Sequence, residues 1–144
     1  MVLGSLPGEE SLRKARYYAH PRNHFWRLIG AVIDRDLEPL PYDGRLQALL
    51  AAKIGLWDVV ATATRHGSLD AAIRDHAPNP LADLAAGLPE LRALAFNGAK
   101  AAAIGRKAIG ATALDLIALP SSSPAYTLSF EAKRGAWLAL RRFL

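Results

Sequence analysis

The sequence predicts an α/β fold in which a parallel sheet is covered by helices on both faces. Short apolar segments alternate with segments of helical periodicity along the 144 residues. Near-continuous apolar segments are typical of strands buried on both faces of a parallel sheet. Strands and helices that alternate in this way form sheets with right-handed crossovers. The length suits one hydrophobic core, and no internal repeat or long linker divides the chain. We therefore predict a single domain over residues 1–144.

Four apolar segments are predicted to form the strands of this sheet. They are residues 1–4, 54–60, 91–96 and 114–119. The third is followed by the turn pair Asn97-Gly98, and Pro120 stops the fourth. The first is too short for a core strand by itself, so we expect the domain to lack part of its N-terminal strand.

The helix predicted at residues 23–33 has the clearest periodicity. Pro21 stands just ahead of it, where proline is favoured. Its apolar positions at helical spacing are Phe25, Leu28, Ile29 and Val32. Phe25 and Trp26 have two interpretations: they belong to the core, as large aromatic residues usually do, or they contact a ligand.

Further helical segments follow along the chain. They are expected at residues 45–53, 68–73, 81–86, 99–109 and from about residue 129. A turn cluster at residues 39–44 precedes the first, and Ser68 is the expected N-cap of the second. The last helix has an apolar face made of Phe130, Trp137, Leu140 and Leu144.

The charge of the chain indicates an anionic partner. The formal net charge is +5 and the pI is near 9.9. Residues 11–33 hold five Arg or Lys residues and no Asp or Glu, interleaved with Tyr, Phe and Trp. Cations among aromatic rings suit a phosphate backbone and an unstacked base, so we expect a nucleic acid rather than a membrane. No apolar run could span a bilayer and no signal peptide is visible, so we expect a cytoplasmic protein.

The absence of cysteine excludes several kinds of chemistry. Disulfides, thiolate nucleophiles and cysteine-ligated metal clusters are ruled out. The four histidines are His20, His24, His66 and His76. Only the first two are at helical spacing, and no carboxylate follows them in the pattern of a helical metal motif. We therefore predict no metal and no cofactor.

Glycine-rich or polar residues lie at the ends of all four predicted strands. They are Gly4-Ser5-Leu6-Pro7-Gly8, Asp58, Asn97-Gly98 and Pro120-Ser121-Ser122-Ser123-Pro124. Because ligands bind beyond the carboxyl ends of parallel strands, we expect these residues to form one site. The chain has no Gly-x-Ser-x-Gly elbow and no Walker phosphate loop, so the site is not that of a serine hydrolase or a P-loop nucleotidase.

The amide of Asn97 suggests what this site reads. An asparagine amide can pair bidentately with a base edge that shows an acceptor beside a donor, as uracil and hypoxanthine do. A structural interpretation stays open as well, because Asn-Gly is a common turn pair. The triple-serine loop could likewise be an ordinary connector.

Five motifs together resemble one family. They are Gly-Ser-Leu-Pro-Gly-Glu-x-Ser-Leu at residues 4–12, Tyr-Tyr-Ala-His-Pro-Arg-Asn-x-Phe-Trp at 17–26, Trp-Asp-Val at 57–59, Phe-Asn-Gly at 96–98 and Leu-Pro-Ser-Ser-Ser-Pro-Ala at 119–125. The chain resembles the hypoxanthine-DNA (deoxyinosine) glycosylase branch of the uracil-DNA glycosylase superfamily over residues 2–143. The resemblance implies a three-layer α/β/α sandwich around a four-stranded, mainly parallel sheet. It also implies a monomeric repair enzyme that flips a deaminated base, above all hypoxanthine, from double- or single-stranded DNA at the nucleoid and excises it hydrolytically.

Substrate-binding residues follow from the same resemblance. Tyr18 corresponds to the aromatic residue that stacks on the flipped base, and Asn97 to the residue that pairs with its edge. With them we assign Gly4 and Ser5 to substrate binding, because the glycine lets the backbone approach a ligand closely. The segment Pro120, Ser121, Ser122, Ser123 and Pro124 corresponds to the second motif of the family, which grips the DNA strand.

The catalytic assignment departs from the mismatch-specific relatives. Their water-positioning asparagine is replaced here by Leu6, and the resemblance to the deoxyinosine branch assigns that task to Asn23. The histidine that opens the second motif in some relatives is Leu119 here. Glu9 and Asp58 are either water activators or structural carboxylates. No lysine stands at a matched catalytic position, so we predict a monofunctional glycosylase.

Two alternative functions remain at this point. One is a uracil- or mismatch-specific glycosylase, because uracil and hypoxanthine share the edge that Asn97 would read. The other is a catalytically inactive domain that binds damaged DNA, since Leu6 cannot position water.

Overall fold

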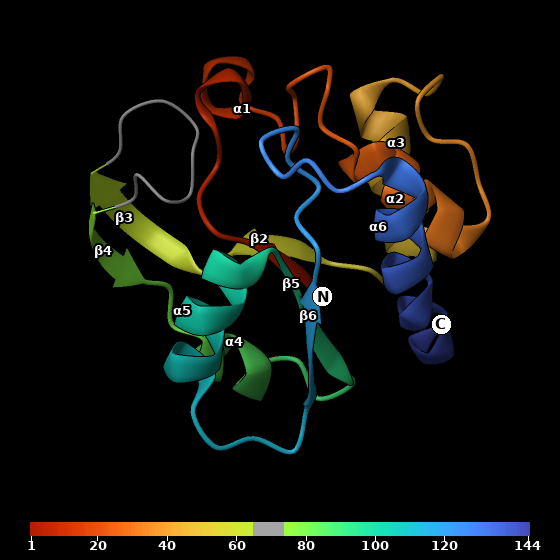
Figure 1. The fold of residues 1–144 in the computed structure, drawn as a ribbon. Helices are drawn as coiled ribbons and strands as arrows, with labels where there is room; N and C mark the ends of the chain where they lie inside the picture. The colour runs from red at the N-terminus through yellow and green to blue at the C-terminus, as the bar shows by residue number, and fades with distance from the viewer. Residues whose placement is uncertain (65–73) are drawn as a thin grey trace.

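The computed structural model describes residues 1–64 and 74–144, and its centre is a four-stranded sheet (Figure 1). The strands are β1 (Val2–Gly4), β2 (Leu56–Asp58), β5 (Ala93–Asn97) and β6 (Asp115–Leu119), in the order β2-β1-β5-β6. All neighbouring strands are parallel, which confirms the predicted class. The capped turn predicted at residues 68–73 lies outside the described residues.

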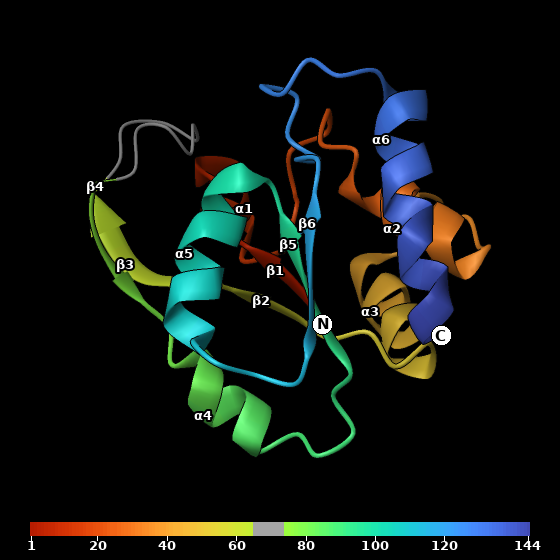
Figure 2. The same ribbon diagram turned by 60° about the horizontal axis from the view of Figure 1, so that its bottom comes forward.

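Helices cover both faces of the sheet, so the predicted three-layer sandwich is confirmed (Figure 2). One face carries α4 (Leu81–Ala86) and α5 (Ala99–Ile109); the other carries α2 (Phe25–Ile33), α3 (Tyr42–Ala51), α6 (Phe130–Trp137) and the 3-10 helix η2 (Leu138–Phe143). Val2 packs in the hydrophobic cluster with α2, whereas the next residue, Leu3, packs in the cluster with α5. Successive side chains of a strand point to opposite faces, so one short strand supplies both cores.

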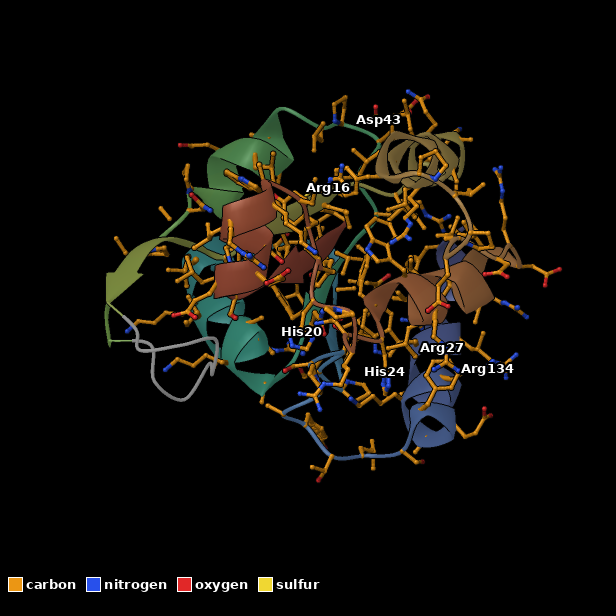
Figure 3. All side chains as sticks on the ribbon, turned by 90° about the horizontal axis from the view of Figure 1, so that it is seen from above. Arg16, His20, His24, Arg27, Asp43 and Arg134 are labelled. Carbon is orange, nitrogen blue, oxygen red and sulfur yellow. The ribbon has the colours of Figure 1, made fainter. Side chains whose placement is uncertain are left out.

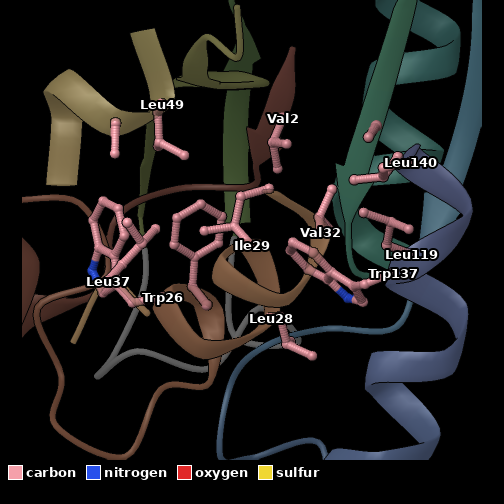
Figure 4. Packing of buried hydrophobic residues seen from close by; sticks show 13 residues of the cluster. Val2, Trp26, Leu28, Ile29, Val32, Leu37, Leu49, Leu119, Trp137 and Leu140 are labelled. Atoms are coloured by element: carbon pink, nitrogen blue, oxygen red, sulfur yellow. The ribbon is translucent and has the colours of Figure 1, made fainter. Parts of the chain in front are cut away.

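Aromatic residues of α2 and α6 fill the core on one side of the sheet (Figure 4). Phe25 is fully buried and packs edge-to-face against Trp26 and Trp137, at centroid distances of 4.9 and 5.8 Å. Such pairs stabilise a fold beyond the burial of their surface. Of the two interpretations of Phe25 and Trp26, the structure therefore shows the core one.

Helix α5 packs very close to the opposite face because it carries Gly105. A Cβ atom at this position would lie 2.2 Å from Cε1 of Phe96, a fully buried residue of β5. No side chain can approach another that closely, so the spacing between helix and sheet requires glycine here.

The single strand predicted at residues 54–60 is instead divided between two sheets. Only residues 56–58 pair with β1. The chain then enters an antiparallel hairpin made of β3 (Val60–Thr64) and β4 (Arg74–Pro78). Val59 and Val60 are both buried, so hydrophobicity alone does not mark where the chain leaves the first sheet.

Two helix starts also differ from the prediction. Helix α3 begins at Tyr42, so the turn predicted at residues 39–44 ends at Pro41, which is extended and precedes the helix. Helix α1 (Glu9–Lys14) was not predicted. Its charges favour a helix, because acidic residues occupy the first turn and basic residues the last.

The end of the chain is less regular than predicted. After α6 the backbone tightens into η2, and Leu144 is 56% exposed although it was expected on the buried face with Trp137. No helix within residues 1–64 and 74–144 is long and apolar enough to cross a membrane.

Candidate active site

A cavity of about 410 Å³ opens at the carboxyl edge of the parallel sheet. Strand register places Asp58 beside Gly4 and Leu119 beside Asn97, so the four strand ends meet at this edge. Every predicted site residue except Pro120 lines the cavity. The lining members are Gly4, Ser5, Tyr18, Asn23, Asn97, Ser121, Ser122, Ser123 and Pro124, together with Glu9 and Asp58.

Strand β1 ends in the cavity wall at Gly4, where Asp58 and Tyr18 come together. A Cβ atom at Gly4 would lie 2.9 Å from Oδ1 of Asp58 and 3.1 Å from Oη of Tyr18. The position therefore has no room for a side chain. Asp58 is buried, so a carboxylate and a phenol from separate elements converge on one point of the wall.

Tyr18 is held in an unusual backbone conformation by the segments around it. Its φ is +54°, in the left-handed region that non-glycine residues seldom adopt. The neighbouring N–H groups of Tyr17 and Ala19 donate to Tyr42 Oη at 2.9 Å and to Ser11 Oγ at 3.0 Å. The Tyr18 ring stacks on Phe25, with centroids 3.9 Å apart and planes 18° apart, so the core supports one face of a ring that lines the cavity.

Ser11 and Tyr42 were not predicted as site residues. Each acts through a single hydrogen bond to backbone that is eight and 25 residues away in the sequence. Ser11 lies inside the first motif, and that is the one signal that could have drawn attention to it.

Asn23 lies at the start of α2, and the helix sets its orientation. Its Oδ1 accepts a hydrogen bond from the Phe25 N–H at 2.9 Å, which satisfies one of the unpaired donors of a helix N-terminus. Its Nδ2 has no hydrogen-bond partner within the described ranges. The side chain therefore presents a donor to the cavity that it lines.

Asn97 uses both ends of its amide to hold the serine loop. Nδ2 donates to Ser122 Oγ and Oδ1 accepts from the Ser122 N–H, each at 2.8 Å. Both residues are buried. The amide thus joins the end of β5 to the loop after β6, a structural task that the sequence did not indicate.

The loop formed by residues 120–124 is also anchored from the side of α2 and α6. The Pro120 carbonyl oxygen accepts a hydrogen bond from Trp137 Nε1 at 2.9 Å. The Ser122 carbonyl oxygen accepts one from the His24 N–H at 3.0 Å, and the Ser123 carbonyl oxygen accepts one from Lys133 Nζ at 3.1 Å. Pro120 therefore lies behind the cavity wall, as an anchor of the loop. Contacts from separate elements therefore hold this loop in place.

His20 lines the cavity, and further basic and histidine side chains lie on the same side of the molecule (Figure 3). Figure 3 looks at the molecule from above and labels Arg16, His20 and His24, with His20 and His24 close to each other in this view. Beyond His24, Arg27 and Arg134 lie together beside α2 and α6, and both line a shallow surface hollow. Arg27 and Arg134 thus place positive charge on the surface formed by α2 and α6.

Neighbouring groups and burial set the ionisation of two side chains that line the cavity, Glu10 and Tyr17. Hydrogen bonds from Lys14 and Arg13 lower the pKa of Glu10 to about 2, so this carboxylate is ionised at neutral pH. Burial, and then the Asp58 carboxylate, raise the pKa of Tyr17 to about 12, so its phenol stays neutral.

His24 is the polar side chain that the fold leaves least satisfied. Its Nδ1 is buried without a hydrogen-bond partner among the described residues, and its ring packs edge-to-face on Phe130 with centroids 5.4 Å apart. Burial, followed by the charges of Lys133 and Arg27, lowers the pKa of His24, so the ring is neutral near pH 7. Within the described side chains no three His, Asp or Glu residues are grouped as metal ligands.

Comparison with known proteins agrees with this architecture. Residues 1–141 match the sequence model of the uracil DNA glycosylase superfamily. This chain belongs to that superfamily. The resemblance stated from the motifs is thereby confirmed.

Two curated proteins are similar to this chain over most of their length. A protein named hypoxanthine DNA glycosylase from Methanosarcina barkeri is 40% identical over 137 residues, which cover 95% of this chain and 86% of that protein. Another of the same name from Methanosarcina acetivorans is 38% identical over 142 residues, with coverages of 99% and 89%. The solution NMR structure of a candidate uracil DNA glycosylase from Methanosarcina acetivorans has a TM-score of 0.84 and 38% identity, and covers 99% of this chain and 88% of that one.

Proposed function

We propose that this chain is a monofunctional DNA glycosylase that flips a deaminated base and hydrolyses its N-glycosidic bond, with hypoxanthine in deoxyinosine as its main substrate. One observation carries the proposal. Residues from motifs far apart in the sequence, including Asn23, Asn97 and Ser121, line a single cavity at the carboxyl edge of the sheet. The names of the two Methanosarcina relatives support hypoxanthine as the base.

The flipped base would be held by stacking and by its edge. Base flipping exposes both faces of the base to the protein. Tyr18 offers a ring that is backed by Phe25 and therefore does not move away when a base stacks on it. Asn97 spends one donor and one acceptor on Ser122, and a side-chain amide keeps a second hydrogen and a second lone pair for the base.

Hydrolysis breaks the bond between the base nitrogen and C1′ of the sugar and joins a water oxygen to C1′. The water loses a proton, and the departing base gains one. An amide is not a strong general base, so we assign to Asn23 the orientation of this water. The Asp58 and Glu9 carboxylates in the cavity wall would stabilise the cationic, oxocarbenium-like sugar. Backbone amides and Asn97 would stabilise the leaving base.

Serine hydroxyls are the groups that we assign to the DNA strand. Ser121 Oγ accepts from the Ser123 N–H at 3.1 Å, and Ser123 Oγ accepts from the Ala125 N–H at 3.2 Å. Each hydroxyl retains a hydrogen to donate, and neither hydrogen has a protein acceptor within the described ranges. Two donors on a loop that lines the cavity suit a phosphodiester oxygen.

The absence of a nucleophilic amine from the wall supports hydrolysis without strand cleavage. No lysine is among the residues that line the cavity in the described part of the chain. Schiff-base chemistry at C1′ requires such an amine.

Our proposal includes a monomer of one domain that acts on double- or single-stranded DNA in the cytoplasm, at the nucleoid.

Single-turnover cleavage of a duplex with one deoxyinosine tests the proposal. A matched deoxyuridine duplex and an undamaged duplex serve as controls, and alkali converts abasic sites to strand breaks. We expect breaks at inosine that depend on the alkali step. Breaks at uracil alone would assign the chain to a uracil or mismatch specificity. Tight binding to the inosine duplex without any cleavage would favour an inactive damage-binding domain.

A further inference from the structure

Lys133 is a lysine whose side chain the fold removes from solvent. Its side chain is 0% exposed, and it lies on the face of α6 that also carries the buried Trp137 one turn later. Helix α6 runs beside the 120–124 loop (Figure 1). Nζ of Lys133 donates to the Ser123 carbonyl oxygen at 3.1 Å and lies 5.5 Å from the centroid of the Tyr126 ring. The amine is thus enclosed between its own helix and the loop that lines the cavity.

No carboxylate pairs with this amine. Within residues 1–64 and 74–144 the ion pairs involve other residues, and no Asp or Glu lies within ion-pair distance of Lys133. Burial accordingly lowers the pKa of Lys133. His24, the N-cap residue of α2, feels the Lys133 charge, which together with burial lowers the pKa of His24. A buried charge without a partner is costly, so a fold that keeps one calls for an explanation.

The loop does not need this charge to keep its shape. The Ser123 carbonyl also accepts a hydrogen bond from the Tyr126 N–H at 3.1 Å. Asn97 holds Ser122 by two further hydrogen bonds, and Trp137 holds Pro120. A methionine at position 133 would fill the same space without a desolvation cost. The packing and hydrogen bonds of the loop therefore do not explain why residue 133 is a lysine.

We propose that Lys133 is a positioning residue whose buried charge attracts a DNA phosphodiester onto the outer side of the serine loop, where the Ser121 and Ser123 hydroxyls donate to it. The inference rests on the proposed function, which assigns this loop to DNA. Lys133 does not touch the phosphate; the loop lies between them. A charge in a protein interior is screened less than one at the surface, so it acts across that distance. DNA supplies a counter-ion that the described residues of the free protein do not provide.

The test compares Lys133→Met with Lys107→Met, which removes an exposed charge from the last turn of α5. Binding to a duplex with a tetrahydrofuran abasic analogue, which cannot be cleaved, is measured over a series of salt concentrations. We expect Lys133→Met to weaken binding about tenfold and to make log K fall less steeply with log salt than in the wild type. Lys107→Met should leave both unchanged. Lys133→Met with wild-type affinity and slope would overturn the inference.

Further measurements separate charge from folding. Lys133→Met should melt no lower than the wild type, because it removes an unpaired buried charge. Lys133→Arg should keep the salt slope of the wild type, since it keeps the charge. A Lys133→Arg protein that loses the slope would mean that shape, not charge, matters.

A measurement on the wild-type protein provides an independent test. NMR titration of the Lys133 side chain should show a higher pKa in the DNA complex than in the free protein, because a nearby anion favours the charged form. The titratable and charged groups on the elements packed against it and on its own helix are His24 at the N-cap of α2, Arg27 on α2, Tyr126 on the loop, and Glu131 and Arg134 on α6. An unchanged pKa of Lys133 would count against the phosphate.

These outcomes are distinct from those of the proposed function. A protein that shows the Lys133 effects but cleaves no deoxyinosine would keep this inference and lose the glycosylase activity. Cleavage of deoxyinosine with normal binding by Lys133→Met would do the reverse. A wild-type protein that binds no DNA overturns both.

Discussion

Asn97 and Ser122, 25 residues apart in the sequence, are joined by two hydrogen bonds of 2.8 Å inside the protein. One bond uses the serine hydroxyl and the other its backbone N–H. The end of β5 and the loop after β6 therefore form one rigid piece of the cavity wall. Any base that reaches Asn97 meets an amide that is already oriented, which lowers the cost of ordering it on binding.

We expect Ser122→Ala to destabilise the protein by about 1–3 kcal/mol, because the Asn97 Nδ2 loses its acceptor in a buried place. Urea denaturation measures this change. Thr127→Ala, at an exposed position of the same connection, is the control and should stay within about 0.5 kcal/mol of the wild type. Equal stabilities of the two variants would contradict the importance of the pair.

Asn23→Asp separates the two tasks that we assign to Asn23. A carboxylate still caps α2 through Phe25, so melting should stay close to that of the wild type. It lacks the amide donor, so single-turnover cleavage should fall about 100-fold or more. Asn23→Ala should lose the same activity and also about 1 kcal/mol of stability. Wild-type cleavage by Asn23→Asp would remove the residue from the mechanism.

Gly4→Ala tests the crowded point in the cavity wall. The new methyl group would displace the Asp58 carboxylate or the Tyr18 hydroxyl, so we expect loss of cleavage with the fold retained. Gly55→Ala is the matched control, just before β2. A Cβ atom there would meet only the flexible end of the Met1 side chain, 3.0 Å away. Circular dichroism checks folding and the single-turnover rate checks activity. Normal rates for Gly4→Ala would mean that the wall is more tolerant than its geometry indicates.

Gly105→Ala and Gly135→Ala place the same methyl group in two helices with opposite expected results. In α5 the methyl group collides with Phe96, and overpacking of this kind costs about 1–3 kcal/mol. In α6 nothing lies within 4 Å, so alanine should stabilise the helix by up to about 1 kcal/mol. Thermal melts of the two variants should shift in opposite directions. A lower melting temperature for Gly135→Ala would contradict the open surroundings of that position.

Acid should weaken α1 through Glu10. Its pKa is about 2 in the folded protein, because Lys14 and Arg13 hydrogen-bond to the carboxylate, and near 4.5 otherwise. The contribution of Glu10 to stability is therefore present above pH 4.5 and is lost as the pH falls toward 2. The melting temperature of Glu10→Gln should depend less on pH over this window than that of the wild type. A Glu10→Gln protein with the full pH dependence of the wild type would contradict this contribution.

Much of the fold follows from local patterns that physical chemistry makes readable. Apolar segments such as residues 91–96 have no stable place except a buried strand, and the spacing from Phe25 to Val32 puts four side chains on one side of a helix. Parallel strands share a carboxyl edge, so the convergence of Gly4 and Asn97 on one site needed no coordinates. The motifs added the predicted roles of Asn23 and Tyr18.

Long-range packing decided the rest. Three features depend on partners that are distant in the sequence. They are the point after Asp58 where the chain leaves the parallel sheet, the stacking of Tyr18 on Phe25, and the burial of Lys133. A lysine in an amphipathic helix reads as a surface charge, because periodicity reports which face is apolar and not how deeply that face is covered. From the sequence, Asn97 is interpreted as part of a turn or as a ligand contact. Its bond to Ser122 cannot be predicted, because that serine lies in a distant loop. Local chemistry sets what each side chain is able to do, and the tertiary contacts select which of those possibilities is used.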